Sequence, residues 1–181
     1  KQIGESAFFF CFNLGGDIDL ASTNVTQIGI FAFFQTNIDS VSFPVSLNHI
    51  GISAFDSCTD LGGHIDLAST NVTQIESNTF RSTKIESVFF PKSLNHIGVE
   101  AFWRCESLTK IDMPGVTHVG DYAFYGTDIT SIRVSGALTL TDNHFKRGIN
   151  DVTPPQYHFR ACGRNHSRGQ SFCNCTGDTS C

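Results

Sequence analysis

The sequence has few cations and no long apolar run. Its 181 residues include 12 Lys and Arg against 17 Asp and Glu, and the formal net charge is −5. The cations are scattered, which excludes the basic surface that nucleic acids or anionic lipids require. No stretch approaches the roughly 20 consecutive apolar residues of a membrane-spanning helix. We therefore expect neither a nucleic-acid partner nor a membrane span in this segment.

The motifs of common enzyme chemistry are also missing. The sequence contains no G-x-S-x-G, no H-E-x-x-H, no phosphate-binding glycine loop and no EF-hand spacing. Three of the seven histidines share one position of a repeat with two glutamines, which predicts a polar column on the turn surface: His49, His96, His118, Gln27 and Gln74. His64 falls in a second polar column. This pattern predicts a chain that is not an enzyme and has no cofactor and no metal site.

Repetition is what the sequence has in abundance. Residues 3–49 and 50–96 are nearly the same segment written twice. Within them and beyond, one phenylalanine recurs at spacings of 25, 22, 25, 22, 22 and 21 residues: Phe8, Phe33, Phe55, Phe80, Phe102, Phe124 and Phe145. Periods of this length are typical of solenoids, in which each coil buries its apolar side only by stacking on its neighbours.

Each coil contains two apolar patterns. An aliphatic residue lies five positions before the recurrent Phe, usually with Ala directly before it, which predicts the inward side of a short helical bend. A short alternating stretch then predicts one parallel β-strand per coil, at 18–20, 41–43, 65–67, 88–90, 111–113 and 132–134. The predicted fold is an α/β repeat solenoid with one short parallel strand and one helical bend per coil of 22–25 residues. The repeat accounts for most of the 17 phenylalanines, which we assign to the core rather than to a binding stripe.

Alternate coils depart from this pattern at paired glycines. Gly15-Gly16 and Gly62-Gly63 precede the strands of the two coils that have 25 residues. Glycines at such positions indicate a β-bulge, and we expect these two coils to bulge where the strand begins.

The cysteines divide the chain into two regions, a solenoid over 1–148 and a Cys-rich tail over 149–181. Cys11, Cys58 and Cys105 recur two coils apart, about 9–10 Å, which is too far for a disulfide, so we expect free buried thiols. The tail has little apolar content and an even number of cysteines, which predicts two disulfides among Cys162, Cys173, Cys175 and Cys181. Zinc binding by the tail, with His158 or His166, is the minor alternative.

Four N-glycosylation sequons indicate the compartment: they begin at Asn24, Asn71, Asn165 and Asn174. Together with the tail cysteines they predict a secreted or cell-surface protein that carries N-linked glycans. The sequence starts without Met and without a secretory leader, which predicts a processed chain or a segment of a longer one.

The coil resembles the BspA-like class of leucine-rich repeats. The resemblance rests on an aliphatic, proline and Gly-x-x-Ala-Phe pattern that is best seen in one coil: Leu108, Ile111, Met113, Pro114, Val116, Val119, Gly120, Ala123 and Phe124. It extends over about 3–145. The pair Cys173 and Cys175 is loosely similar to the centre of an EGF-like module. The resemblance implies a leucine-rich-repeat array and a role in adhesion or surface interaction.

The expected function is therefore non-enzymatic protein binding or adhesion at the cell surface. The alternative is a structural subunit of an extracellular fibre or coat, which assembles head-to-tail through the solenoid ends and the tail. Partners are accordingly a protein ligand or a second copy of the chain. The candidate contact face is one outward column of the predicted strands, in which Phe89 is the one large apolar residue: Asp19, Ser42, Asp66, Phe89, Asp112 and Arg133.

Overall fold

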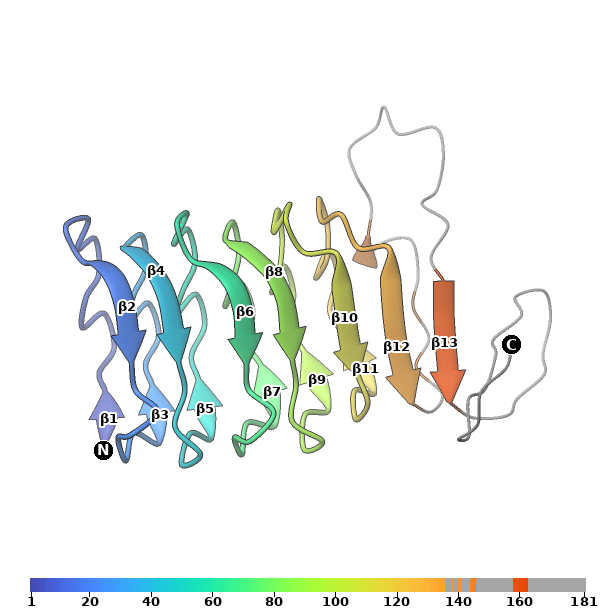
Figure 1. The fold of residues 1–181 in the computed structure, drawn as a ribbon, viewed down its shortest axis with the longest axis horizontal. Coiled ribbons are helices and arrows are strands. Elements are labelled where there is room, and N and C mark those ends of the chain that lie inside the picture. The colour runs from blue at the N-terminus through green and yellow to red at the C-terminus, as the bar shows by residue number, and fades with distance from the viewer. Residues whose placement is uncertain (136–137, 139, 141–143, 146–157, 163–181) are drawn as a thin grey trace.

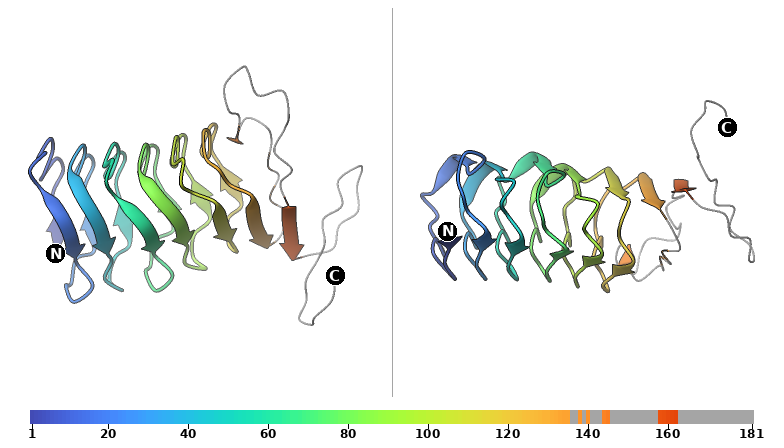
Figure 2. Two further views of the ribbon diagram at one scale, coloured as in Figure 1. Left: turned by 45° about the horizontal axis from the view of Figure 1, so that its top comes forward. Right: turned by 90° about the horizontal axis from the view of Figure 1, so that it is seen from below.

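The computed structural model describes residues 1–135, 138, 140, 144–145 and 158–162. These residues form a parallel β-solenoid of six coils, with the strands of successive coils side by side along its long axis (Figure 1). Each coil contributes one short strand, a turn segment and one long strand. Figure 2 shows the same stacking from two further directions. The repeat solenoid predicted from the Phe spacing is confirmed.

The long strands form the face that is nearest the viewer in Figure 1, which we call the strand face. They are β2 (Gly15–Asp19), β4 (Asn37–Ser42), β6 (Gly62–Asp66), β8 (Lys84–Phe89), β10 (Lys110–Met113), β12 (Ser131–Ser135) and β13 (His158–Cys162). All pairings are parallel, in the orders β2-β4 and β6-β8-β10-β12-β13. Each predicted strand overlaps an observed one, in most coils at its C-terminal part.

A second set of parallel strands lies behind the lower ends of the first (Figure 1). Each has two residues: β1 (Gln2–Ile3), β3 (Gln27–Ile28), β5 (His49–Ile50), β7 (Gln74–Ile75), β9 (His96–Ile97) and β11 (His118–Val119). The predicted His and Gln column is the first residue of five of these strands. The sequence analysis placed that column on a turn and did not predict the strands, because two residues carry too short an alternation to be recognised.

The strand register shifts beside both glycine pairs, but the extra residue is not in the 25-residue coils, where the bulge was predicted. The β2–β4 register shifts between Gly16 and Asp17, and the β6–β8 register shifts between Gly63 and His64. Both glycines at the shift are left-handed, with φ of +79° at Gly16 and +64° at Gly63. The extra residue lies on the neighbouring strand in each case, at Asp39 in β4 and at Glu86 in β8.

The predicted helical bend is wrong, because the turn segments form no α-helix in any coil that the structure describes. Their backbone N–H groups alternate between two partners. Phe33 N donates to Ala54 O of the next coil at 2.8 Å, whereas Phe34 N donates to Phe31 O within its own coil at 3.2 Å. Since half of the donors bond to a neighbouring coil, the i to i−4 ladder of a helix does not form.

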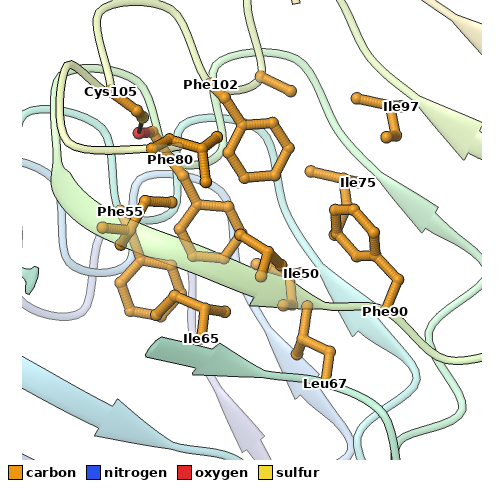
Figure 3. Close-up of a cluster of buried hydrophobic side chains, with 14 of the residues drawn as sticks. Ile50, Phe55, Ile65, Leu67, Ile75, Phe80, Phe90, Ile97, Phe102 and Cys105 are labelled. Carbon is orange, nitrogen blue, oxygen red and sulfur yellow. Dashed lines mark hydrogen bonds between the residues drawn. The ribbon is translucent and has the colours of Figure 1, made fainter. Parts of the chain in front are cut away.

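The core is a continuous stack of the recurrent phenylalanines. Neighbouring rings from Phe8 to Phe145 have centroids 5.0–5.6 Å apart and are tilted by 16° or less. Figure 3 shows Phe55, Phe80 and Phe102 in this row, with aliphatic side chains from both sets of strands beside them. Phe55, Phe80 and Phe102 are fully buried. The stack lies between the strand face and the turn segments and joins the coils through one continuous core.

Candidate functional site

The strand face places the predicted contact column in register. Asp19 is paired with Ser42 in one sheet, and Asp66, Phe89 and Asp112 are successive partners in the other, followed by Arg133. Phe89 is 49% exposed and is the only large apolar side chain exposed on the strand face in the described coils. Its ring lies between the register positions of two carboxylates. The column therefore combines one apolar anchor with flanking charges, as protein-binding surfaces do.

Hydrogen bonds within and between coils orient the polar members of the strand face. Ser42 Oγ donates to Asp19 Oδ1 at 2.5 Å, and Ala21 N donates to the same oxygen at 2.9 Å. Both bonds lower the pKa of Asp19, and the bond from Ser42 has the larger effect. Arg133 Nη1 donates to Asp112 Oδ2 at 3.4 Å. The column thus begins with an ionised carboxylate in the first coil and ends with an ion pair.

His64 is the one histidine of the strand face in the six coils, and it contacts a hydroxyl. Its Nδ1 lies 2.8 Å from Ser87 Oγ, and its ring centroid lies 6.3 Å from that of Phe89. A catalytic histidine normally has a third group that orients it. Among the described residues no carboxylate bonds to the other ring nitrogen of His64. The contact therefore belongs to the surface beside Phe89.

Aromatic side chains gather on a second surface, which the sequence analysis missed. We call it the turn face: residues 6–10, 31–35, 53–57, 78–82, 100–104 and 122–126. The expectation that the phenylalanines are core is wrong at the first coil, where Phe9, Phe10 and Phe12 are 41%, 43% and 56% exposed. Their rings contact one another and Phe34, for example Phe9 and Phe34 at 5.1 Å between centroids.

A different aromatic cluster lies on the turn face of the last three coils. We call it the Trp-Tyr cluster, and it comprises Arg81, Trp103, Arg104, Tyr122 and Tyr125. Trp103 is stacked on Tyr125 at 6.1 Å, and Tyr125 meets the edge of Tyr122 at 6.0 Å. The Cζ atoms of Arg81 and Arg104 each lie 4.5 Å from the Trp103 ring centroid. A sequence signal existed, since Phe9, Phe34, Trp103 and Tyr125 each directly follow a core Phe and cannot share its inward direction.

Between the two aromatic clusters the turn face is polar. Asp56 is buried there and accepts a hydrogen bond from Ser57 Oγ at 2.9 Å. Burial raises the pKa of this carboxyl, and the bonds from Ser57 and Ser53 and the charge of Arg81 oppose that shift. Arg81 in turn lies 3.8 Å from Glu100. This one polar coil, 53–57, separates the phenylalanines of the first two coils from the Trp-Tyr cluster.

The repeat cysteines are free, as predicted, but only two of the three are buried. Cys58 and Cys105 are fully buried, whereas Cys11 is exposed in the first coil. Each buried thiol donates to a carbonyl of the preceding coil, Cys58 to Phe33 O at 2.9 Å and Cys105 to Phe80 O at 3.0 Å. Burial raises the pKa of Cys58, and it raises the pKa of Cys105 to about 12. These thiols are structural and unreactive.

Two of the four predicted glycosylation sites can be placed. Asn24 and Asn71 are both exposed, and Asn71 Nδ2 donates to Val45 O at 2.9 Å. Asn165 and Asn174 lie outside the described residues, as do Cys173, Cys175 and Cys181. Cys162 is the last residue of β13, so the described part of the tail is one more parallel strand. The two predicted disulfides therefore remain predictions.

The described residues were also searched for a metal site and for a membrane-spanning helix. Among them, no group of three His, Cys, Asp or Glu side chains is arranged to hold a metal ion. Nor does that part of the chain contain a helix with the length and apolarity to cross a bilayer.

The parallel coils, the stacked Phe column and the aliphatic positions define a leucine-rich-repeat solenoid. The chain belongs to the BspA-type leucine-rich repeat family, whose family model matches residues 1–64 and 26–152 with six copies. Leucine-rich-repeat solenoids are in general non-enzymatic scaffolds for protein interaction. A search of curated proteins finds no match to the chain.

Two solved bacterial structures are similar to the chain. One is a leucine-rich cell surface protein from Faecalibacterium prausnitzii, with 20% identity and a TM-score of 0.37. The other is a leucine-rich repeat protein from Bacteroides ovatus, with 18% identity and a TM-score of 0.36. The matches cover 77% and 89% of this chain, and 64% and 57% of those chains. This chain therefore spans less than two thirds of the length of either.

Proposed function

We propose that the chain is a secreted or cell-surface module for protein binding or adhesion, and that it presents its strand face to a protein partner. The observation that carries the proposal is the exposed Phe89 ring, held in register between Asp66 and Asp112. A solenoid keeps such a column fixed, so little side-chain entropy is lost when a partner covers it. Family membership supports an interaction role, and the exposed sequons at Asn24 and Asn71 support an extracellular place with N-linked glycans.

The test is a screen of the biotinylated chain on an array of secreted proteins and receptor ectodomains, with each hit measured by biolayer interferometry. We expect Phe89→Ala and Asp66→Lys to weaken binding by about tenfold or more, because anchors of this kind dominate interface energetics. Val45→Ala is the matched control, since it removes a side chain that is 66% exposed in the turn after β4. Unchanged affinity in both strand-face variants would remove this face from consideration.

A second candidate function is head-to-tail assembly into a fibre or coat. The observation in its favour is the first coil, where the core ring of Phe8 is 38% exposed whereas that of Phe33 is 1% exposed. A further coil of the same pattern would complete the stack, and in a fibre or coat another copy would supply it. Sedimentation velocity tests this: we expect large particles that Phe8→Glu dissolves, and a parent chain that stays monomeric at high concentration would contradict assembly.

A further inference from the structure

We propose that the Trp-Tyr cluster on the turn face is a second binding site, which takes an acidic segment of a partner protein. The site is separate from the strand face and does not depend on it. Trp, Tyr and Arg are the residues most enriched at energetic centres of protein interfaces, and here five of them lie together over three coils.

The first argument is backbone conformation. Each turn segment has a left-handed residue two positions before and two positions after the core Phe, and these positions account for all eleven positive-φ residues other than glycine in the described part. Tyr122 has φ of 57° and Arg104 has φ of 54°. Side chains other than Gly and Asn are disfavoured there. Folding alone would favour Gly or Asn, so another role accounts better for a Tyr and an Arg at these positions.

The same position in the next coil carries a glycine. Gly126 is the equivalent of Arg104 and has φ of 72°. A Cβ at Gly126 would lie 3.2 Å from Arg104 Cγ, whereas the glycine leaves that side open. On the other side, the equivalent residue is the small Ser82. Arg104 is therefore exposed and has small neighbours in both adjacent coils.

The second argument is charge. Arg81 is paired with Glu100, but Arg104 has no carboxylate partner among the residues that the structure describes. Its guanidinium is held against Trp103. A guanidinium with open donors selects carboxylates, with which it forms charge-assisted, bidentate bonds. The complementary ligand at this point is an Asp or Glu side chain, with apolar contacts to Tyr122, which is 43% exposed.

The roles within the cluster differ. Arg81, Trp103 and Tyr125 come from three successive coils and stack on one another, which is a structural arrangement. Arg81 and Tyr125 approach the Trp103 ring from the coils on its two sides, which disfavours stacking of a sugar ring on it. Tyr122 and Arg104 are exposed beside this stack. A polypeptide segment that brings a carboxylate and an apolar side chain fits them better than a glycan does.

The experiment is a selection of random dodecapeptides displayed on phage against the immobilised chain, followed by fluorescence anisotropy of the enriched peptides. We expect enrichment of Asp and Glu beside apolar residues, and binding that weakens with added salt. Arg104→Glu should weaken binding by about tenfold or more. Tyr122→Asn should also weaken it, while its thermal midpoint stays equal or rises because Asn suits the left-handed position.

Phe89→Ala is the control and should leave peptide binding unchanged, so failure of this site and failure of the strand face are distinguishable. Four outcomes would overturn the proposal. They are enriched peptides without acidic residues, affinity that Arg104→Glu does not change, a thermal midpoint lowered by Tyr122→Asn, and retention on immobilised heparin that is lost in Arg104→Glu. The last would assign the surface to an acidic glycan.

Discussion

The strand face and the turn face are built by the same six coils from two different backbones. On the strand face, residues alternate in and out of a parallel sheet, and the outward side chains sit on ordinary extended backbone. On the turn face, two positions in every coil are left-handed, and all but one carry a residue other than glycine. The backbone of the strand face therefore accepts most side chains at its outward positions. On the turn face, the left-handed positions carry side chains that this backbone conformation disfavours.

The largest expected effect on stability is in the core that both faces share. Phe102 is fully buried between the rings of Phe80 and Phe124, at 5.5 Å and 5.6 Å. Phe102→Ala should lower the free energy of unfolding by about 3–5 kcal/mol, measured by chemical denaturation. The control is Phe89→Ala, whose exposed ring should matter by less than about 0.5 kcal/mol. A similar loss in both variants would contradict the core assignment.

The second prediction concerns the thiols behind the turn face. In the unfolded chain Cys105 ionises near its ordinary pKa of 9.0, and burial raises this pKa to about 12 in the fold. Because the folded pKa is raised, its contribution to stability is complete below pH 9.0 and is lost as the pH rises towards 12. Cys105→Thr should remove this dependence, since Thr83 fills the equivalent position of the preceding coil.

The matched measurement is thermal unfolding of parent and variant across this pH range. Equal loss of stability in both would contradict the assignment to Cys105. Thiol labelling provides a second check under native conditions: the exposed Cys11 should react quickly, and Cys58 and Cys105 should react only on unfolding.

The third prediction tests the left-handed glycine beside the register shift on the strand face. Gly63 has φ of +64°, and no atom lies within 4 Å of the place that a Cβ would take, so Gly63→Ala adds only the left-handed penalty. That penalty is about 1–2 kcal/mol. Gly62→Ala is the control, because the nearest atom would be at an ordinary 3.6 Å. Chemical denaturation should show a loss in the first variant and little change in the second. The reverse order would contradict the bulge.

The smallest expected effect compares ion pairs on the two faces. Lys84 Nζ lies 2.9 Å from Asp60 Oδ1, but the two side chains are 64% and 44% exposed. Lys84→Ala should change the free energy of unfolding by less than about 1 kcal/mol, and the difference should vanish at high salt. Arg81→Ala removes both an ion pair and a contact with Trp103, so it should cost more and keep part of its effect in salt. Equal salt sensitivity would contradict this.

Much of the architecture followed from periodicity alone. The spacing of Phe8, Phe33 and their equivalents predicted the solenoid, and the alternating stretches predicted the long strands. The glycine pairs predicted where along the strands the register is irregular, but the extra residue lies on the neighbouring strand. The strand-face column was predicted as well, because the outward positions of a strand recur at every second residue.

The aromatic clusters of the turn face were not predicted. The left-handed positions recur two residues before and after each core Phe, but the residue types there differ from coil to coil, so the sequence does not mark them.

The sequence by itself determined the recurrent apolar positions of each coil and the number of coils, because stacking equal units requires the same apolar positions in each. It also determined the free state of the repeat thiols through their two-coil spacing. Only the tertiary structure decided that the bends are not helical, that Cys11 is exposed while Cys58 is buried, and that aromatic residues gather at Trp103 and Tyr125. The physical reason is that contacts between neighbouring coils decide these features, and neighbouring coils are a whole repeat apart in the chain. Half of the turn N–H groups bond to the next coil, and the buried Cys58 bonds to the coil before it.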